Sequence, residues 1–242
     1  MGVCLLRVGI DTSKEMGGSL GPLLNPDGLF EYVPVREAYG RPGKSYAKTK
    51  GENTGKLLST FVPELNSETV HYDPEFRTNT YGDYLRKPKE GLRSLDCGDL
   101  LVFYAGLEPW RFAAPKKRGL YIIGYFEVER AGLAKEYSKE ELQHLFANNF
   151  HVKPYLESRG VLEKKLFLVK GRKRGKEKGS RLLRKAQLIS NKQEPDSANR
   201  LVWVLNPRQR KVFGKIGRRN CIQRAVPHWV NPDSACWIRK MR

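Results

Sequence analysis

The chain has 242 residues, of which 39% are hydrophobic, and its formal net charge at pH 7 is +19. This length and composition allow a sizeable core, which excludes a wholly disordered protein. The charge is uneven, because residues 1–163 hold 22 Lys and Arg against 22 Asp and Glu, and residues 164–242 hold 23 against four. A localised cationic surface attracts polyanions, so nucleic acid is the leading predicted partner. The alternative is a basic face that only keeps the protein soluble.

Several other classes are disfavoured. The longest apolar runs, residues 100–107 and 120–128, fall short of the roughly 20 residues that a membrane span needs, so no membrane association is predicted. The N-terminal segment lacks a basic region and a small-residue cleavage site, and the cytoplasm is the predicted compartment. The four cysteines are widely separated, and the histidines show no HxxxH or HExxH spacing. Neither a disulfide framework nor structural zinc is expected.

In the first half of the chain, residues 3–10 predict a buried strand, and the Gly- and Pro-rich segment that follows predicts a long loop. Residues 30–35 predict a short strand that Pro34 confines to an edge or a bulge. Residues 36–54 have no periodicity and predict a surface excursion.

The second half is more regular. Residues 100–106 and 119–130 predict an antiparallel hairpin with a long basic tip. Residues 138–148 predict a helix, because Ser138 and Glu141 have the spacing of a capping box. Strand-like pieces then alternate with loops over residues 164–171, 172–180, 184–190 and 200–205.

About seven short strands and few long helices predict an α+β fold, with a curved mixed sheet or a partly closed β-barrel and a few short helices. We expect a single domain over residues 1–205, with a basic C-terminal extension, residues 206–242, packed on it.

The first candidate site follows the first strand. Asp11, Thr12 and Ser13 lead into a Gly-rich loop, and Asp27 follows it. A carboxylate, hydroxyls and free backbone N–H groups at the end of a strand can bind phosphate or a base edge. The loop matches neither the Walker pattern nor GxGxxG, which argues against nucleotide triphosphates. The alternative is that Asp11 and Thr12 cap a turn.

The second candidate site is the segment from His71 to Glu75. Extended backbone would place His71, Asp73 and Glu75 on one face, where the imidazole could act as a general base or bind a divalent ion. Pro74 complicates this geometry, and an ordinary Asp-Pro turn is the alternative.

Aromatic and basic residues alternate around the predicted hairpin, where Tyr104 and Trp110 could stack on bases; such stacking contributes about 1–3 kcal/mol. Core packing is the alternative for most of these rings. Further along, Lys170, Ser180 and Arg181 combine a hydroxyl with cations, which suits a phosphate clamp. Here the alternative is a solvated charge run.

Several motifs occur in linked order: RVGIDTS, DGLFEYVPV, HYDPEF, TYGD, GDLLVFYAGL, GLYIIGYFEV, NNFH and GSRLLRKAQLIS. Over about residues 5–190 this series resembles the third of the nucleotide-modification-associated domain families. The resemblance implies a nucleic-acid modification context rather than a particular reaction. It carries over as candidate site positions Asp11, Asp27, Glu31, His71, Asp73, Tyr81, Asp83, Tyr104, His151, Lys170, Ser180 and Arg181. The hairpin is also similar, over about 30 residues, to the barrels of PUA, EVE and ASCH domains, and this resemblance implies a PUA-like barrel.

These observations predict a nucleic-acid-binding protein of a DNA or RNA base-modification system that holds a base or nucleotide in an acidic and aromatic pocket. The predicted nucleic-acid-binding residues are Tyr104, Trp110, Lys170, Arg172, Lys173, Arg174, Ser180 and Arg181. The other predicted pocket residues are Thr12, Ser13, Asp27, Glu31, Tyr81, Asp83 and His151.

The alternative is an enzyme, of hydrolase or glycosidase type, that acts on nucleic acid or a modified nucleotide. Asp11, His71 and Asp73 are its candidate catalytic residues. No cofactor is expected, although a divalent metal at the acidic cluster stays open. A third possibility is a scaffold that docks acidic protein partners.

Overall fold

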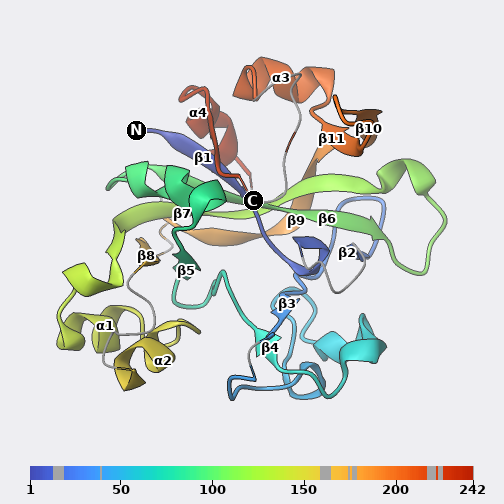
Figure 1. Cartoon of the computed structure of the whole chain (residues 1–242). Coiled ribbons are helices and arrows are strands. Elements are labelled where there is room, and N and C mark those ends of the chain that lie inside the picture. Colours follow the sequence, from blue (N-terminus) through green and yellow to red (C-terminus); the bar gives the residue numbers. More distant parts are fainter. Residues whose placement is uncertain are drawn as a thin grey trace.

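The computed structural model describes residues 1–12, 19–38, 40–158, 165–173, 175, 179–216, 222 and 226–241. Its centre is an eight-stranded mixed sheet (Figure 1). The strands of this sheet are β1 (Val3–Arg7), β2 (Gly21–Leu23), β5 (Thr80–Tyr84), β6 (Leu100–Pro109), β7 (Gly119–Leu133), β8 (Leu166–Gly171), β9 (Arg181–Ser190) and β12 (His228–Val230).

The strand order is β12-β1-β6-β7-β8-β5, with β2 beside β6 and β9 beside β7. β6 pairs in parallel with β1 and β2, and every other pairing in this sheet is antiparallel. β7 is long enough to pair with β6, β8 and β9, and register shifts interrupt all three of its ladders. Such bulges bend a sheet, and this one does not close into a barrel along its described strands.

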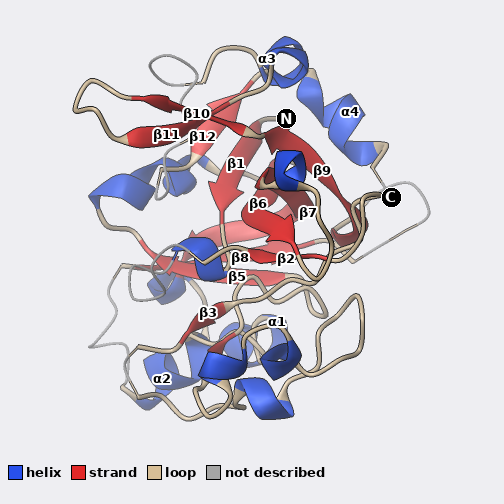
Figure 2. Cartoon of the chain, turned by 90° about the vertical axis from the view of Figure 1, so that its right-hand side faces the viewer, coloured by secondary structure: helices blue, strands red, loops and turns tan. Residues whose placement is uncertain are grey.

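The described residues also form two smaller sheets of two strands each. β3 (Val35–Arg36) pairs with β4 (Val70–His71), and β10 (Lys192–Pro195) pairs with β11 (Leu201–Val204). Within the described residues, four short α-helices flank the sheet: α1 (Lys139–Leu145), α2 (Val152–Glu157), α3 (Pro207–Phe213) and α4 (Ser234–Arg239). Figure 2 shows α3 and α4 on one side of the main sheet and α1 and α2 on the other.

The core has three parts. The largest lies on the main sheet, where Phe213 of α3 and Ile238 of α4 join the buried side chains of the strands. A second cluster fills the lobe around β3 and β4, and a third lies where α1 and α2 pack against Leu166 and Leu168 of β8. Among the described helices, none has the length and apolar character that a bilayer crossing requires.

The α+β class and the curved mixed sheet are confirmed. The β6–β7 pair is the predicted antiparallel hairpin, and Ser138 and Glu141 form the predicted capping box of α1. α1 ends at Leu145, three residues earlier than predicted, and β1 ends before Gly9, whose φ is 94°.

The predicted strand at residues 30–35 is wrong for most of its length, because only Val35 lies in a strand. Glu31 turns its carboxylate inwards, where it accepts hydrogen bonds from the backbone N–H groups of Tyr32, Asn53 and Thr54. Glu31 therefore anchors the 51–54 loop through hydrogen bonds instead of belonging to a strand. At the other end of the chain, β12 belongs to the main sheet through its pairing with β1. The division at residue 205 stays a prediction.

Candidate functional site

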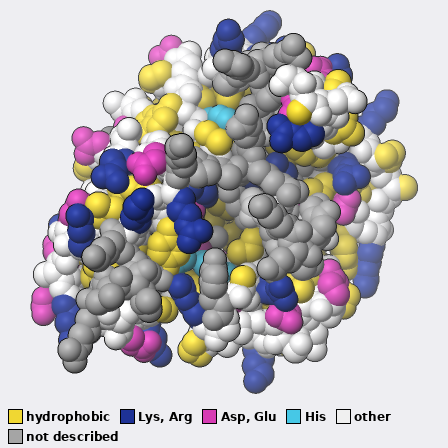
Figure 3. Space-filling model, in the orientation of Figure 1, with side chains coloured by type: hydrophobic (Ala, Val, Ile, Leu, Met, Phe, Trp, Pro, Cys, Tyr) yellow, Lys and Arg dark blue, Asp and Glu magenta, His cyan; other side chains and the backbone are white. Residues whose placement is uncertain are grey.

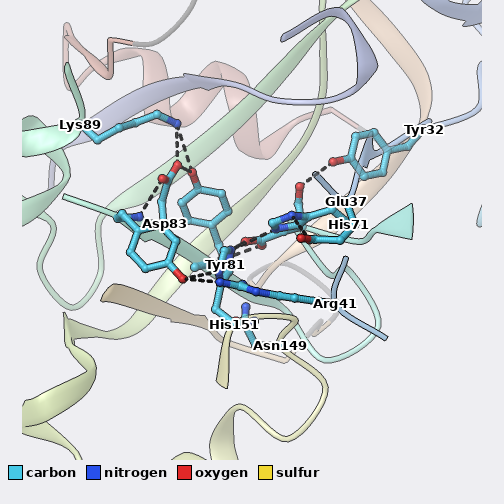
Figure 4. A network of polar contacts seen from close by, with 12 residues as sticks. Tyr32, Glu37, Arg41, His71, Tyr81, Asp83, Lys89, Asn149 and His151 are labelled. Carbon is cyan, nitrogen blue, oxygen red and sulfur yellow. Dashed lines mark hydrogen bonds and ion pairs between the residues drawn. The ribbon is translucent and has the colours of Figure 1, made fainter. Parts of the chain in front are cut away.

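Two histidines and an aspartate meet where three segments converge. His71 ends β4, Asp73 follows it, and His151 directly precedes α2. The two imidazole Nε2 atoms lie 3.1 Å apart, and Nε2 of His151 lies 3.4 Å from Oδ2 of Asp73. We call these three residues the histidine centre; Figure 4 shows the two rings pointing towards one another.

A second layer of contacts orients the rings. A carboxylate oxygen of Glu37 lies 3.2 Å from Nδ1 of His71, on the ring edge opposite His151. The Tyr84 hydroxyl lies 3.4 Å from Nδ1 of His151 and accepts a hydrogen bond of 3.2 Å from the Arg41 guanidinium. Each histidine therefore holds its Nδ1 against a protein group while its Nε2 faces the centre (Figure 4).

Asp73 is held by the backbone of β5. Its Oδ2 accepts a hydrogen bond of 2.9 Å from the N–H of Gly82, and the Tyr32 hydroxyl donates to its carbonyl oxygen. Burial raises the pKa of Asp73 above its ordinary value, although the hydrogen bond with His151 opposes the shift. A Cβ on Gly82 would lie 2.9 Å from Asn149 Oδ1 and from His151 Cδ2. The glycine is thus what lets the 149–151 segment approach the strand.

A charged cluster adjoins the centre at β5, the strand whose Gly82 binds Asp73. Asp83 accepts hydrogen bonds from the Tyr81 hydroxyl and, at 2.7 Å, from the Lys89 ammonium. Burial is the largest single effect and raises the pKa of Asp83, but the charge and hydrogen bond of Lys89 together with the Tyr81 hydrogen bond outweigh it and hold the pKa below its ordinary value. Asp83 is therefore an ionised carboxylate at neutral pH.

A small cavity of about 200 Å³ connects these groups with the end of β1. Its lining includes the histidine centre, Tyr81, Asp83, Thr12 and Arg7. Arg7 donates a buried hydrogen bond of 2.7 Å to Asp11. Asp11 is not a lining residue of this cavity, and it contacts the lining through Arg7. Figure 3 shows histidine side chains in a hollow on this face, beside Lys and Arg side chains.

A larger cavity of about 940 Å³, which we call the basic groove, lies between β9, β8 and the end of α1. Its cationic lining residues are Arg77, Lys170, Lys173, Arg181 and Arg184, set against Glu52 and Glu129. Within the described residues, the buried Oγ of Ser180 and Nε of Arg181 have no hydrogen-bond partner. The wall of the groove thus holds a hydroxyl and a guanidinium N–H that no described protein group satisfies.

A third cavity of about 510 Å³ shares Glu52, Arg77 and Asn148 with the basic groove. We call it the aromatic pocket, because the rings of Tyr72 and Phe150 line it. Three exposed lysines, Lys44, Lys48 and Lys50, surround these rings. Phe150 also stacks on His71, with ring centroids 4.4 Å apart, so the pocket and the histidine centre share a wall.

The structure brings many of the predicted site residues together, in two groups. Thr12, His71, Asp73, Tyr81, Asp83 and His151 line the small cavity, and Lys170, Lys173, Ser180 and Arg181 line the basic groove. Glu75 lies apart from the centre, because its carboxylate accepts the backbone N–H groups of Arg77 and Thr78.

Other predicted residues lie elsewhere. Tyr104 is fully buried in the core, and Trp110 packs against Phe61 with ring centroids 5.1 Å apart. Asp27 is exposed in a turn, and Glu31 is the buried acceptor of the 51–54 loop. Arg172 lies outside both linings, at 3.9 Å from Glu127. Ser13 and Arg174 lie outside the described residues.

Sequence reasoning missed Glu37, Arg41 and Gly82, and it missed the rings of the aromatic pocket. Tyr72 had a usable signal, since it alternates with His71 and Asp73 and so points to the opposite side of an extended segment. Phe150 has the same relation to His151. Glu37 and Arg41 carry no such signal, because their contacts join distant segments of an irregular chain.

The fold and site together define an α+β protein in which a largely buried histidine centre adjoins an aromatic pocket, and the pocket shares lining residues with a cationic groove. The chain belongs to the family described as Nucleotide modification associated domain 3, whose family model matches residues 3–228. This membership places the protein among nucleotide modification systems. The comparisons found no match among curated proteins or among solved structures.

Proposed function

We propose that this protein binds nucleic acid within a nucleotide modification system, with the phosphates in the basic groove and a base or nucleotide in the aromatic pocket. The observation that carries the proposal is the cationic lining of the basic groove, where Arg77, Lys170, Lys173, Arg181 and Arg184 gather around one cavity. Guanidinium and ammonium groups there suit phosphate oxygens, which accept several hydrogen bonds at once.

Charge supports the same ligand. Lys173 and Arg184 are exposed on the groove, while Arg181 is nine-tenths buried, with its guanidinium 5.5 Å from the centre of the Tyr125 ring. A rigid, partly desolvated arginine flanked by mobile cations combines a fixed contact with long-range attraction. Lys and Arg that neutralise phosphates release condensed counterions, which makes such binding salt-dependent.

The aromatic pocket supports a base rather than a second phosphate. Tyr72 and Phe150 offer ring faces, and the carboxylates of Glu52 and Glu75 in the same lining can accept hydrogen bonds from exocyclic amino groups. The cavity of about 510 Å³ falls in the range of ordinary small-molecule sites. This pocket, rather than Tyr104 and Trp110, is the place that we propose for a base.

A fluorescence anisotropy titration with a labelled 20-nucleotide single strand and its duplex tests the groove. About four phosphate contacts predict roughly 100-fold weaker binding between 50 and 200 mM salt. Arg184→Ala should reduce the slope of log K against log salt by about one, whereas the exposed Arg208→Ala on α3 should leave it unchanged. An affinity that does not change with salt concentration, or equal effects of the two variants, would refute the proposal.

The pocket has its own test in the same titration. Phe150→Leu keeps an apolar side chain but removes the ring face, and it should weaken binding roughly tenfold without changing the salt slope. The control is Phe112→Leu, because Phe112 is partly buried against the main core and lines neither cavity. Unchanged binding by Phe150→Leu would contradict the proposal that this pocket binds a base.

The histidine centre favours a second candidate, an enzyme of hydrolase or glycosidase type acting on nucleic acid or a modified nucleotide. His71 has the carboxylate partner that orients a general base, and the buried Asp73 approaches the same Nε2 atom of His151 that His71 contacts. Asp73→Asn should then abolish turnover and leave oligonucleotide binding intact. Mass spectrometry of incubated modified and unmodified substrates checks for products, and none with any substrate would count against this candidate.

A further inference from the structure

We propose that His71, Asp73 and His151 bind one divalent transition-metal ion of the zinc type. The ligand atoms would be the two Nε2 atoms and a carboxylate oxygen of Asp73. One ligand atom from each residue lies within 4.8 Å of the others. Imidazole and carboxylate are the donors that such ions take in sites with open coordination positions.

The distances suit an ion at the centre of the three residues. Metal bonds of about 2.0–2.1 Å imply ligand-to-ligand separations of about 3.3 Å in a tetrahedral site. The Nε2 atoms of His71 and His151 are 3.1 Å apart, and Nε2 of His151 is 3.4 Å from Oδ2 of Asp73. Two edges of the triangle thus already have the required length.

The contacts of the outer layer favour the same state of the rings. The Glu37 carboxylate oxygen, 3.2 Å from Nδ1 of His71, favours the ring proton on Nδ1, and a ring protonated there has its free lone pair on Nε2, which faces the centre. This histidine–carboxylate pairing is the usual outer layer of a metal-bound imidazole. His151 holds its Nδ1 against the Tyr84 hydroxyl, which leaves its own Nε2 facing the centre.

Burial adds a reason for a cation. The side chains of Asp73 and His151 are 4% and 5% exposed, and the contacts of the Asp73 carboxylate are the backbone N–H of Gly82 and the His151 ring. A buried carboxylate whose nearest ionisable partners are imidazoles gains most from a permanent positive charge. A divalent ion supplies that charge while both rings stay neutral, without a second proton on either ring.

The cavity indicates what else the ion would hold. Its volume of about 200 Å³ is below the roughly 300 Å³ at which small-molecule pockets begin, so a water or a phosphate-sized group fits better than a whole nucleotide. Arg7, Arg41 and Lys89 also line it, which favours a small anionic group. The proposal concerns the ion alone and does not depend on nucleic-acid binding.

Calorimetric titration of the chelator-stripped full chain with zinc chloride tests the site. We expect one equivalent to bind to the parent protein, and at least roughly 100-fold weaker binding for His71→Gln and for His151→Gln. His144→Gln is the matched control, because His144 is exposed at the end of α1 and lies outside the centre. No zinc binding by the parent protein, or equal loss in the control variant, would overturn the proposal.

Two further measurements keep the test decisive if a variant fails to fold. Bound Co²⁺ in the parent protein should give the visible absorption of a four- or five-coordinate ion, and one equivalent of zinc should abolish it. Zinc should also raise the midpoint of thermal unfolding with increasing concentration, as a ligand of the native state does. A Co²⁺ spectrum of a fully hydrated ion, or no thermal shift, would contradict the site.

Discussion

The histidine centre and the basic groove are built in opposite ways. In the centre, each ring has a fixed partner on both nitrogens, and the aspartate accepts a hydrogen bond from the backbone of a strand. Among the described cations of the groove, Lys173 and Arg184 are exposed and Arg181 is nearly buried. The centre therefore depends on directed contacts between distant segments, whereas the groove depends on the sum of its charges.

This contrast teaches how each region should respond to change. A buried, directed site fails when one atom is misplaced, because its members cannot move independently. A surface of several cations loses affinity in steps, one phosphate contact at a time. The aromatic pocket lies between the two regions, because it shares a wall with the centre at His71 and Phe150 and shares lining residues with the groove, yet variants should separate them.

The largest expected effect is that of Gly82→Ala on the centre. The added Cβ would lie 2.9 Å from His151 and Asn149, so the 149–151 segment must shift and zinc binding should be lost. Gly91→Ala is the control, because its Cβ would meet nothing closer than 3.8 Å. Calorimetry measures the zinc affinity of both variants, and Gly91→Ala should bind zinc as the parent does. Retained zinc binding would mean that Gly82 does not set the geometry of the centre.

A smaller effect is expected from Glu37→Gln. The amide keeps the shape of the side chain but weakens the hold on Nδ1 of His71, so zinc affinity should fall roughly 10- to 100-fold. Glu64→Gln, at an exposed acid in another part of the same lobe, should change nothing. The same calorimetric titration measures both variants. Equal affinities for the two would show that the outer layer is not needed.

A still smaller effect should follow the loss of two lysines beside the aromatic pocket. Lys44→Ala/Lys50→Ala removes two exposed cations, so oligonucleotide affinity should fall several-fold at low salt and converge with the parent value as salt rises. Lys135→Ala/Lys139→Ala removes two lysines outside the three cavities. Identical losses in the two double variants would indicate general charge attraction rather than a defined path.

The smallest effect is expected far from both regions, at the exposed Asp196–Arg200 pair. The hydrogen bond with Arg200 lowers the pKa of Asp196 to about 2. Because its pKa is lowered in the folded state, ionised Asp196 stabilises the fold at pH values above the ordinary aspartate pKa, and this stabilisation is lost as the pH falls towards 2. Asp196→Asn should therefore leave thermal unfolding at pH 7 almost unchanged, because exposed pairs contribute little. A marked drop in the unfolding midpoint at pH 7 would show that this pair matters to the fold.

Local sequence signals predicted those parts of the fold that local physics decides. The capping box of α1 and the β6–β7 hairpin have their signals within a few neighbouring residues. The segment at residues 30–35 was predicted wrongly, because the Glu31 carboxylate accepts hydrogen bonds from a loop more than 20 residues away. No period-two pattern reveals a carboxylate that accepts hydrogen bonds from another part of the chain.

The candidate site divides in the same way. Alternation along one segment places His71 and Asp73 together, whereas His151 came only from resemblance to a family, since 80 residues separate it from His71. The charge count pointed to the last third of the chain, but Lys44, Lys48, Lys50 and Arg77 of the balanced part line the same run of cavities. Net charge along a sequence cannot show which distant residues the fold brings to one surface.

Hydrogen–deuterium exchange with and without a saturating oligonucleotide tests the central claim most directly. The proposal predicts slower exchange in residues 77–79, 144–148 and 179–184, which line the basic groove, and little change in α3 and α4. The basic C-terminal segment would then contribute charge without contact. Protection confined to α3 and α4, with the groove unchanged, would contradict the account.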